Sequence, residues 1–98
     1  MTRPVRFRRQ ARIEFDEAAD WYESRRIGLG PKFTAAVRSV IETATTTPGL
    51  HPRVFEDVRE GLVHGFPYCV YYRDTKQQIL VIAIFHTSRD PSNWQSRA

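Results

Sequence analysis

The stretch that decides the fold is Ile79-Leu80-Val81-Ile82-Ala83-Ile84-Phe85, which continues directly into His86-Thr87-Ser88-Arg89-Asp90-Pro91-Ser92-Asn93-Trp94. An unbroken apolar run of this length predicts a strand that lies inside a sheet and is covered on both faces. The residues after it predict a last helical turn, with Asp90 as its N-cap and Pro91 as its first residue. We expect this turn to carry Trp94 back into the core. The strand therefore fixes a histidine and an arginine at its own end.

Two helices are predicted upstream of this strand. The first, from about Ala11 to about Arg26, has an apolar stripe at helical spacing and carboxylates on its other face. The stripe consists of Phe15, Ala18, Ala19 and Tyr22, widened by Trp21, and the acidic face of Glu14, Asp16, Glu17, Asp20 and Glu23. A second stripe, Phe33, Ala36, Val37, Val40, Ile41 and Ala44, ends at Pro48-Gly49. Because only the turn Gly28-Leu29-Gly30-Pro31 separates the helices, with Pro31 expected to open the second, we expect an antiparallel hairpin.

Short strands account for the rest of the chain. Val5–Phe7 predicts the first strand and Val58–Phe66 the second, in which Gly61 and Gly65 are expected to mark bulges. Pro67 precedes a third strand, Tyr68–Arg73, and the fourth is the apolar run. The order β-α-α-β-β-β predicts an α+β fold in one domain, residues 1–98: a helical hairpin packed on a mostly antiparallel four-stranded sheet, with a short C-terminal helical turn.

Composition limits the classes of function. The 98 residues carry a net charge of +4 and a pI of about 9.7, which favours acidic partners. The single Cys69 cannot form an internal disulfide and lies in an apolar strand pattern, and no segment is long enough to span a bilayer. We therefore expect a cytoplasmic protein with a buried Cys69. His51 and His64 have no ligand spacing to each other or to Cys69, so neither a metal nor a cofactor is predicted.

Four blocks of sequence, in order, resemble one protein family. They are Ala11-x-x-Glu14-Phe15-x-Glu17-Ala18-x-x-Trp21-Tyr22-Glu23, then Gly28-Leu29-Gly30 before Phe33, then Phe66-Pro67-Tyr68-Cys69-Val70-Tyr71-Tyr72-Arg73, and last His86-x-x-Arg89-Asp90-Pro91-x-x-Trp94. Together they are similar to the RelE/ParE superfamily of bacterial toxins, in the branch labelled plasmid stabilisation proteins. The resemblance implies a toxin of a type II toxin-antitoxin system, which arrests growth when it is released from a cognate acidic antitoxin.

The superfamily contains two mechanisms. RelE-like members are ribosome-dependent mRNA endoribonucleases, whereas ParE-like members poison DNA gyrase without evident catalytic residues. Metal-free RNA cleavage needs an acid, a base and cations, and the candidates for these roles are His86, Arg73, Arg89, Arg59 and Glu56. The third strand carries Tyr68 where RelE-like nucleases carry an arginine, so the resemblance is closer to ParE.

Three functions therefore remain: a gyrase inhibitor that is not an enzyme, a metal-independent endoribonuclease, and a basic binding module without toxicity. Candidate target-binding residues are Tyr68, Tyr72, Arg73, His86 and Arg89. Each also has a packing role: His86 as a strand-end hydrogen-bonding group, Arg89 and Asp90 as a pair or cap. Candidate antitoxin-binding residues are Arg6, Arg8, Arg9, Arg12 and Arg38. We expect the antitoxin to wrap the helical hairpin and a sheet edge in a hetero-oligomer, and a small acidic protein encoded in the neighbouring reading frame would be its natural source.

Overall fold

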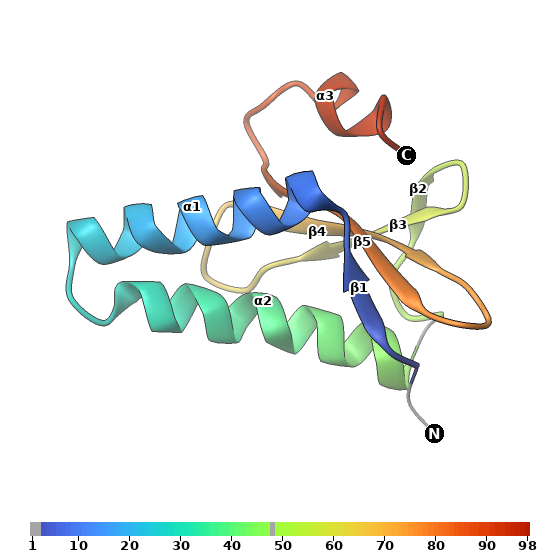
Figure 1. Ribbon diagram of the computed structural model, residues 1–98, viewed down its shortest axis with the longest axis horizontal. Coiled ribbons are helices and arrows are strands. Elements are labelled where there is room, and N and C mark those ends of the chain that lie inside the picture. The colour runs from blue at the N-terminus through green and yellow to red at the C-terminus, as the bar shows by residue number, and fades with distance from the viewer. Residues whose placement is uncertain (1–2, 48) are drawn as a thin grey trace.

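The computed structural model describes residues 3–47 and 49–98, and Figure 1 shows a helical hairpin on one face of a sheet. The elements in chain order are β1 (Val5–Phe7), α1 (Arg9–Arg25), α2 (Leu29–Thr46), β2 (Arg53–Phe55), β3 (Val58–Leu62), β4 (Tyr68–Asp74), β5 (Ile79–His86) and α3 (Ser92–Gln95). The sheet order is β1-β5-β4-β3-β2, with β1 parallel to β5 and the other pairs antiparallel. The α+β fold is confirmed, but the sheet has five strands rather than four, because the three residues of β2 also pair.

The helical hairpin is confirmed with shifted bounds. Helix α1 begins at Arg9, two residues before the expected start, and α2 begins at Leu29, so Pro31 is its third residue. A proline is tolerated there because the first N–H groups of a helix have no acceptor within it. Between the helices, Gly28 adopts φ 91°, and the Glu23 carboxylate accepts the N–H groups of Gly28 and Gly30 at 3.0 and 2.9 Å. The expected stop at Pro48 lies outside the described residues.

Strand β5 is buried on both faces, as its apolar run predicts. On the helix side, Ile79, Val81 and Ile84 join the apolar stripes of α1 and α2. On the other side, Ile82, Ala83 and Phe85 pack in a second cluster with Trp94. Trp94 is 2% exposed and stacks on the Tyr71 ring at 4.0 Å between centroids, so its predicted role as a core anchor is confirmed.

A bulge in β5 changes which of its residues face the helices. Tyr71 of β4 lies opposite Ala83 and Tyr72 lies opposite Val81, so Ile82 is an extra residue in β5. Before the bulge, the odd-numbered residues Ile79 and Val81 face the helices; after it, the even-numbered Ile84 does. The extra residue thus reverses the alternation of side chains along the second half of the strand.

The two glycines of the second predicted strand do not mark bulges. Gly61 lies in regular register opposite Val70, and a β-carbon there would come within 2.4 Å of Val40 Cγ1 on α2. Gly65 has φ 83° in the turn that follows β3, which ends at Leu62 rather than at Phe66. Close packing against α2 explains the glycine at Gly61, and a positive φ explains the glycine at Gly65.

The last turn begins one residue later than expected. Pro91 occupies the N-cap position of α3, and the Asp90 carboxylate accepts the Ser92 N–H at 3.0 Å. In the part of the chain that the structure describes, no helix is both long and apolar enough to cross a membrane.

Candidate functional site

A groove of about 510 Å³ lies between α1 and the end of β5, and we call it the α1–β5 groove. Its lining residues come from α1, from the start of β4 and the residue before it, from β5 and from the loop that follows. They are Glu14, Glu17, Ala18, Trp21, Tyr22, Pro67, Tyr68, Ile84, His86 and Arg89. The groove therefore brings together three of the five predicted target-binding residues, Tyr68, His86 and Arg89.

His86 is held at the end of β5 by contacts on two sides. Its ring meets the Tyr68 ring edge to face at 5.2 Å between centroids. Its Nδ1 accepts the Ser88 backbone N–H at 3.0 Å and lies 2.8 Å from the Ser88 hydroxyl. Because Nδ1 is an acceptor here, the proton of the neutral imidazole is on Nε2. His86 is thus a strand-end histidine with a hydrogen bond to the backbone, and its partner is Ser88.

The rim of the groove is aromatic and cationic. The side chain of Trp21 is 52% exposed, so it does not belong to the buried stripe in which the sequence placed it. Arg25 lies over the Trp21 ring at 4.6 Å, and Arg89 lies over the Phe85 ring at 4.5 Å. Burial raises the pKa of Tyr68 above its ordinary value of 10.0, so its phenol, already neutral at physiological pH, is neutral over a still wider range. Exposed tryptophan and arginine with a neutral tyrosine are typical of protein-binding surfaces.

The remaining nuclease candidates lie at the opposite end of the β4–β5 hairpin. Arg73 contacts Asp57 at 2.8 Å and Glu56 at 4.0 Å, and the hydrogen bond from Arg73 lowers the pKa of Asp57. Arg59 donates to the His51 carbonyl at 2.7 Å and lies 3.8 Å from Asp74, which also pairs with Arg3. These two arginines are therefore already paired with groups of the protein itself.

Strand geometry separates the two groups of candidates. Tyr68 lies opposite His86 at one end of β4, and Arg73 is five residues further along the strand, which places it roughly 17 Å away. Tyr72 is fully buried, and its hydroxyl lies 2.7 Å from His51 Nδ1. The structure thus places neither Tyr72 nor Arg73 in the α1–β5 groove.

A part-buried ion pair joins Glu14, which lines the groove, to Arg97, and we call it the Glu14–Arg97 clamp. The Arg97 guanidinium donates to both carboxylate oxygens of Glu14, at 3.0 and 2.9 Å, and to the Ile82 carbonyl at 3.3 Å. Glu14 also accepts the Ile84 N–H at 3.1 Å. Strand β1 ends at Phe7, so the clamp occupies the edge of β5 that β1 leaves uncovered.

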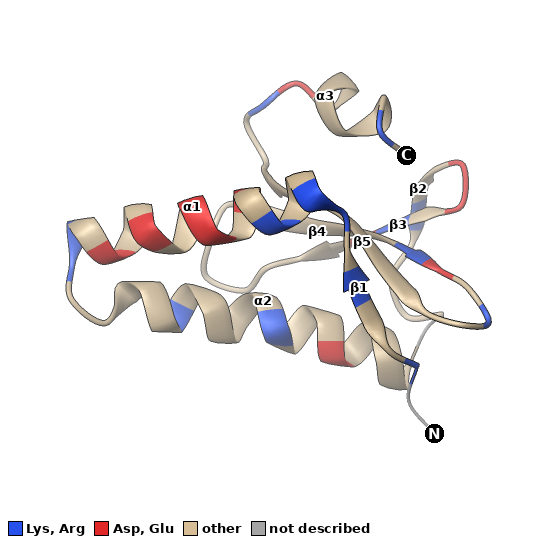
Figure 2. Ribbon diagram, in the orientation of Figure 1, with Lys and Arg blue, Asp and Glu red and all other residues tan. Residues whose placement is uncertain are grey.

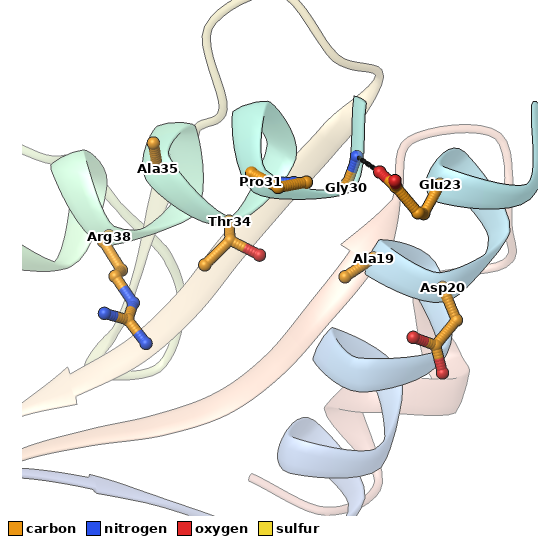
Figure 3. Close-up of a pocket in the computed structure, with 8 residues that line it drawn as sticks. All are labelled: Ala19, Asp20, Glu23, Gly30, Pro31, Thr34, Ala35 and Arg38. Carbon is orange, nitrogen blue, oxygen red and sulfur yellow. Dashed lines mark hydrogen bonds between the residues drawn. The ribbon is translucent and has the colours of Figure 1, made fainter. Parts of the chain in front are cut away.

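The predicted antitoxin-binding arginines form two separate groups. Arg6, Arg8, Arg9 and Arg12 gather on β1 and the start of α1, as the blue segments of Figure 2 show. Arg38 instead lines a groove of about 560 Å³ between α1 and α2, with Asp20 and Glu23 across from it (Figure 3). The rest of that lining is small: Ala19, Gly30, Pro31, Thr34 and Ala35.

Cys69 is buried, and the histidines do not cluster with other possible metal ligands. Cys69 is 3% exposed, and burial, helped by a hydrogen bond to Glu60, raises the pKa of its thiol to about 12. The thiol is therefore protonated and unreactive at neutral pH. Within residues 3–47 and 49–98, no three histidine, cysteine or carboxylate side chains are grouped as metal ligands.

Sequence reasoning missed Trp21 and Glu14, which line the groove, and Arg97, which pairs with Glu14. Trp21 immediately precedes Tyr22, so the two side chains lie about 100° apart around the helix. At that angle Trp21 could have been assigned to the edge of the apolar stripe rather than to its buried part. Glu14 is half-buried although it was placed on the solvent face. Its role, like that of Arg97, depends on where β1 ends, for which the sequence has no local signal.

Comparisons with known proteins agree with this fold. The family model described as "ParE toxin of type II toxin-antitoxin system, parDE" matches residues 5–91. A solved structure described as "Chromosomal ParDE TA system from P. aeruginosa" is similar with a TM-score of 0.72 and 16% identity, over 89% of this chain and 98% of that one. No curated protein sequence matches. Since the family model covers most of the chain, the protein belongs to the ParE toxin family of type II toxin-antitoxin systems.

Proposed function

We propose that this toxin arrests growth by binding DNA gyrase through the α1–β5 groove, without catalysing a reaction of its own. Cytoplasmic gyrase is then the target, and an acidic antitoxin prevents the contact. The observation that carries the proposal is the separation of the five nuclease candidates into two groups about 17 Å apart. A single scissile phosphate cannot contact both groups.

The groups that remain at His86 are poorly suited to RNA cleavage. The Ser88 N–H occupies Nδ1, so the neutral ring presents a protonated Nε2, which can donate but cannot remove a proton from a 2′-hydroxyl. The α1 wall of the groove carries Glu17, whose carboxylate repels phosphate. These features support a protein ligand over a nucleic acid.

The side chains that line the groove are also of the types that bind proteins. Trp21 offers a large exposed apolar surface, and Arg89 a guanidinium already ordered over Phe85. Tryptophan, tyrosine and arginine are the residues that contribute most of the binding energy in many protein interfaces. In this mechanism, affinity for the target replaces catalysis as the source of toxicity.

Two assays run side by side test the proposal: inhibition of DNA supercoiling by purified gyrase, and ribosome-dependent cleavage of mRNA. We expect the wild-type protein to inhibit supercoiling and to leave transcripts intact. Trp21→Ala and Arg89→Ala should each weaken inhibition about tenfold or more, as for interface anchors. Ile27→Ala is the matched control, because Ile27 is 92% exposed and lies outside the groove.

Other results would assign a different function. New mRNA ends within codons, abolished by His86→Gln, would support the RelE-like endoribonuclease. Induction of the wild-type protein without growth arrest would support the basic binding module. Equal inhibition by wild type and by the Trp21→Ala, Arg89→Ala double variant would keep gyrase as the target but move the contact elsewhere.

A further inference from the structure

Three side chains that can donate hydrogen bonds line one end of the α1–β5 groove, and we call it the donor end. The neutral ring of His86 presents its Nε2–H there, because Nδ1 accepts the Ser88 N–H. The Tyr68 ring packs against this imidazole, and its phenol is a second donor. Arg89 adds a guanidinium, for which no carboxylate of residues 3–47 or 49–98 is a salt-bridge partner.

The positive charge of Arg89 is ordered but not neutralised. Its guanidinium lies over the Phe85 ring at 4.5 Å. The carboxylate of Asp90, the red segment beside it in the loop after β5 in Figure 2, accepts the Ser92 N–H at 3.0 Å. Burial has the largest effect on the pKa of Tyr68 and raises it, while the charge of Arg89 opposes this rise, so the guanidinium acts on the phenol. The donor end therefore offers a ligand one uncompensated positive charge.

The α1 wall of the groove limits the charge that a ligand can carry. Glu17 is exposed and lines the groove, and none of the salt bridges in the described chain involves it. Glu14, one turn earlier on the same helix, is neutralised by Arg97 at 2.9 Å. Since Glu17 repels a dianion more strongly than a monoanion, the groove favours a ligand group with a single negative charge.

These features together select one class of ligand group. A cation would be repelled by Arg89, and a neutral carbonyl would leave the guanidinium uncompensated. A carboxylate accepts hydrogen bonds from all three donors and neutralises the charge, and such charge-assisted bonds are the stronger kind. The rings of Trp21 and Tyr22, which meet edge to face at 5.1 Å, line the groove beside this end and offer an apolar surface.

We propose that the donor end of the groove, formed by Tyr68, His86 and Arg89, binds an aspartate or glutamate side chain of the target, and that Trp21 and Tyr22 hold an apolar side chain next to it. The identification of the target as gyrase rests on the proposed function; the carboxylate site itself does not. The segment of gyrase that the toxin recognises is then one in which an acidic residue adjoins an apolar residue.

Sodium acetate tests the site without gyrase. Titrated into the full-length toxin, it should shift the NMR signals of the His86 imidazole and Arg89 guanidinium nitrogens along a saturating curve, which sodium chloride at equal ionic strength should not do. Arg89→Gln should abolish the saturating shift at His86. Lys76→Gln, which removes one positive charge from an exposed residue in the turn at the other end of the β4–β5 hairpin, is the matched control and should leave the curve unchanged.

The affinity for purified gyrase should follow the same residues. Arg89→Gln should raise Kd about tenfold or more, and Arg89→Lys by less, because an ammonium keeps the charge but not the forked geometry. Glu17→Gln should lower Kd about two- to fivefold, because it removes a charge that repels the carboxylate. Glu42→Gln, the same change at an exposed site of α2 outside the groove, should leave Kd unchanged. Tighter binding by Glu17→Gln cannot arise from misfolding.

Three results would overturn the inference. Weaker binding by Glu17→Gln together with tighter binding by Arg89→Gln would mean that the groove takes a cation. Saturation by inorganic phosphate at lower concentration than by acetate, with competition between a DNA duplex and gyrase, would identify a phosphate site. Gyrase binding that Trp21→Ala weakens but Arg89→Gln and Glu17→Gln leave unchanged would refute the carboxylate and keep the proposed function. Conversely, acetate binding that Arg89→Gln abolishes, in a toxin that does not bind gyrase, would support the site and refute gyrase as its target.

Discussion

Removal of the Glu14–Arg97 clamp should destabilise the protein more than any other single ion pair. Glu14 and Arg97 are 83 positions apart in sequence, and their side chains are only 9% and 19% exposed. The pair also holds the backbone of β5, through the Ile84 N–H and the Ile82 carbonyl. The loss of one partner therefore leaves both a charge and a backbone group without their hydrogen bonds.

The expected magnitudes follow from what each substitution leaves behind. Glu14→Ala leaves the Arg97 guanidinium and the Ile84 N–H unpaired. Because the pair is part-buried, the loss of unfolding free energy should be about 3 kcal/mol, the lower end of the range for buried pairs. Arg97→Ala costs about 1.5 to 3 kcal/mol, because Glu14 keeps the Ile84 N–H. Arg97→Lys should fall between Arg97→Ala and wild type, since an ammonium cannot fork onto both oxygens.

Urea denaturation of the two single variants and the double variant measures the coupling between the residues. We expect a coupling energy of about 1 to 2 kcal/mol. Arg12→Ala provides the control, because the Arg12–Asp16 pair is exposed and 3.4 Å long, and its loss should change the unfolding free energy by less than about 0.5 kcal/mol. Amide exchange at Ile84 should accelerate in Glu14→Ala.

Additive effects of Glu14→Ala and Arg97→Ala would refute this reasoning, as would an Ile84 amide that stays protected without Glu14. The first result would mean that the two side chains do not act together. The second would mean that another group bonds the edge of β5.

Four further predictions concern stability. Burial, and secondarily the charge of Arg59, lowers the pKa of His51. The neutral imidazole therefore contributes to folding stability in full above the unfolded pKa of about 6.5, and this contribution is lost as the pH falls through the lower folded pKa. His51→Gln should thus flatten the dependence of the unfolding free energy on pH. Glu56 adopts φ 52°, so Glu56→Gly should stabilise by up to about 1 kcal/mol in thermal denaturation, and Glu56→Ala should not. Gly61→Ala should cost about 1 to 3 kcal/mol in urea, and Val40→Ala in the same chain should recover part of that loss by making room. Trp94→Ala should cost about 3 to 5 kcal/mol, and an unchanged denaturation midpoint would mean that the indole is not part of the core.

The sequence predicted the elements whose signals are local. The apolar run of β5 and the stripe of α2 are each long enough to identify a buried element, and both were placed correctly. Strand β2 was not predicted, because three residues with mostly exposed side chains lack a periodic pattern. Its pairing arises from the tight turn that returns the chain into β3.

The site was less predictable because it is assembled from distant segments. The resemblance drew attention to Tyr68, His86 and Arg89, but only the folded chain brings them against Trp21 of α1. Tyr72 and Tyr68 share a strand face, yet Tyr72 lies deep under the helices and Tyr68 at their margin. Alternation along a strand predicts which face a residue occupies, not how far the covering layer extends.

The bulge at Ile82 has a consequence for how the site tolerates change in chain length. Counted by simple alternation from Ile79, His86 would point to the Trp94 side of the sheet; the one extra residue turns it toward α1 instead. The orientation of this histidine is thus encoded by the number of residues in β5 rather than by their identity. Deletion of a single aliphatic residue would leave the composition of the strand almost unchanged and still remove the imidazole from the groove. Related chains should therefore accept substitutions here far more readily than insertions or deletions.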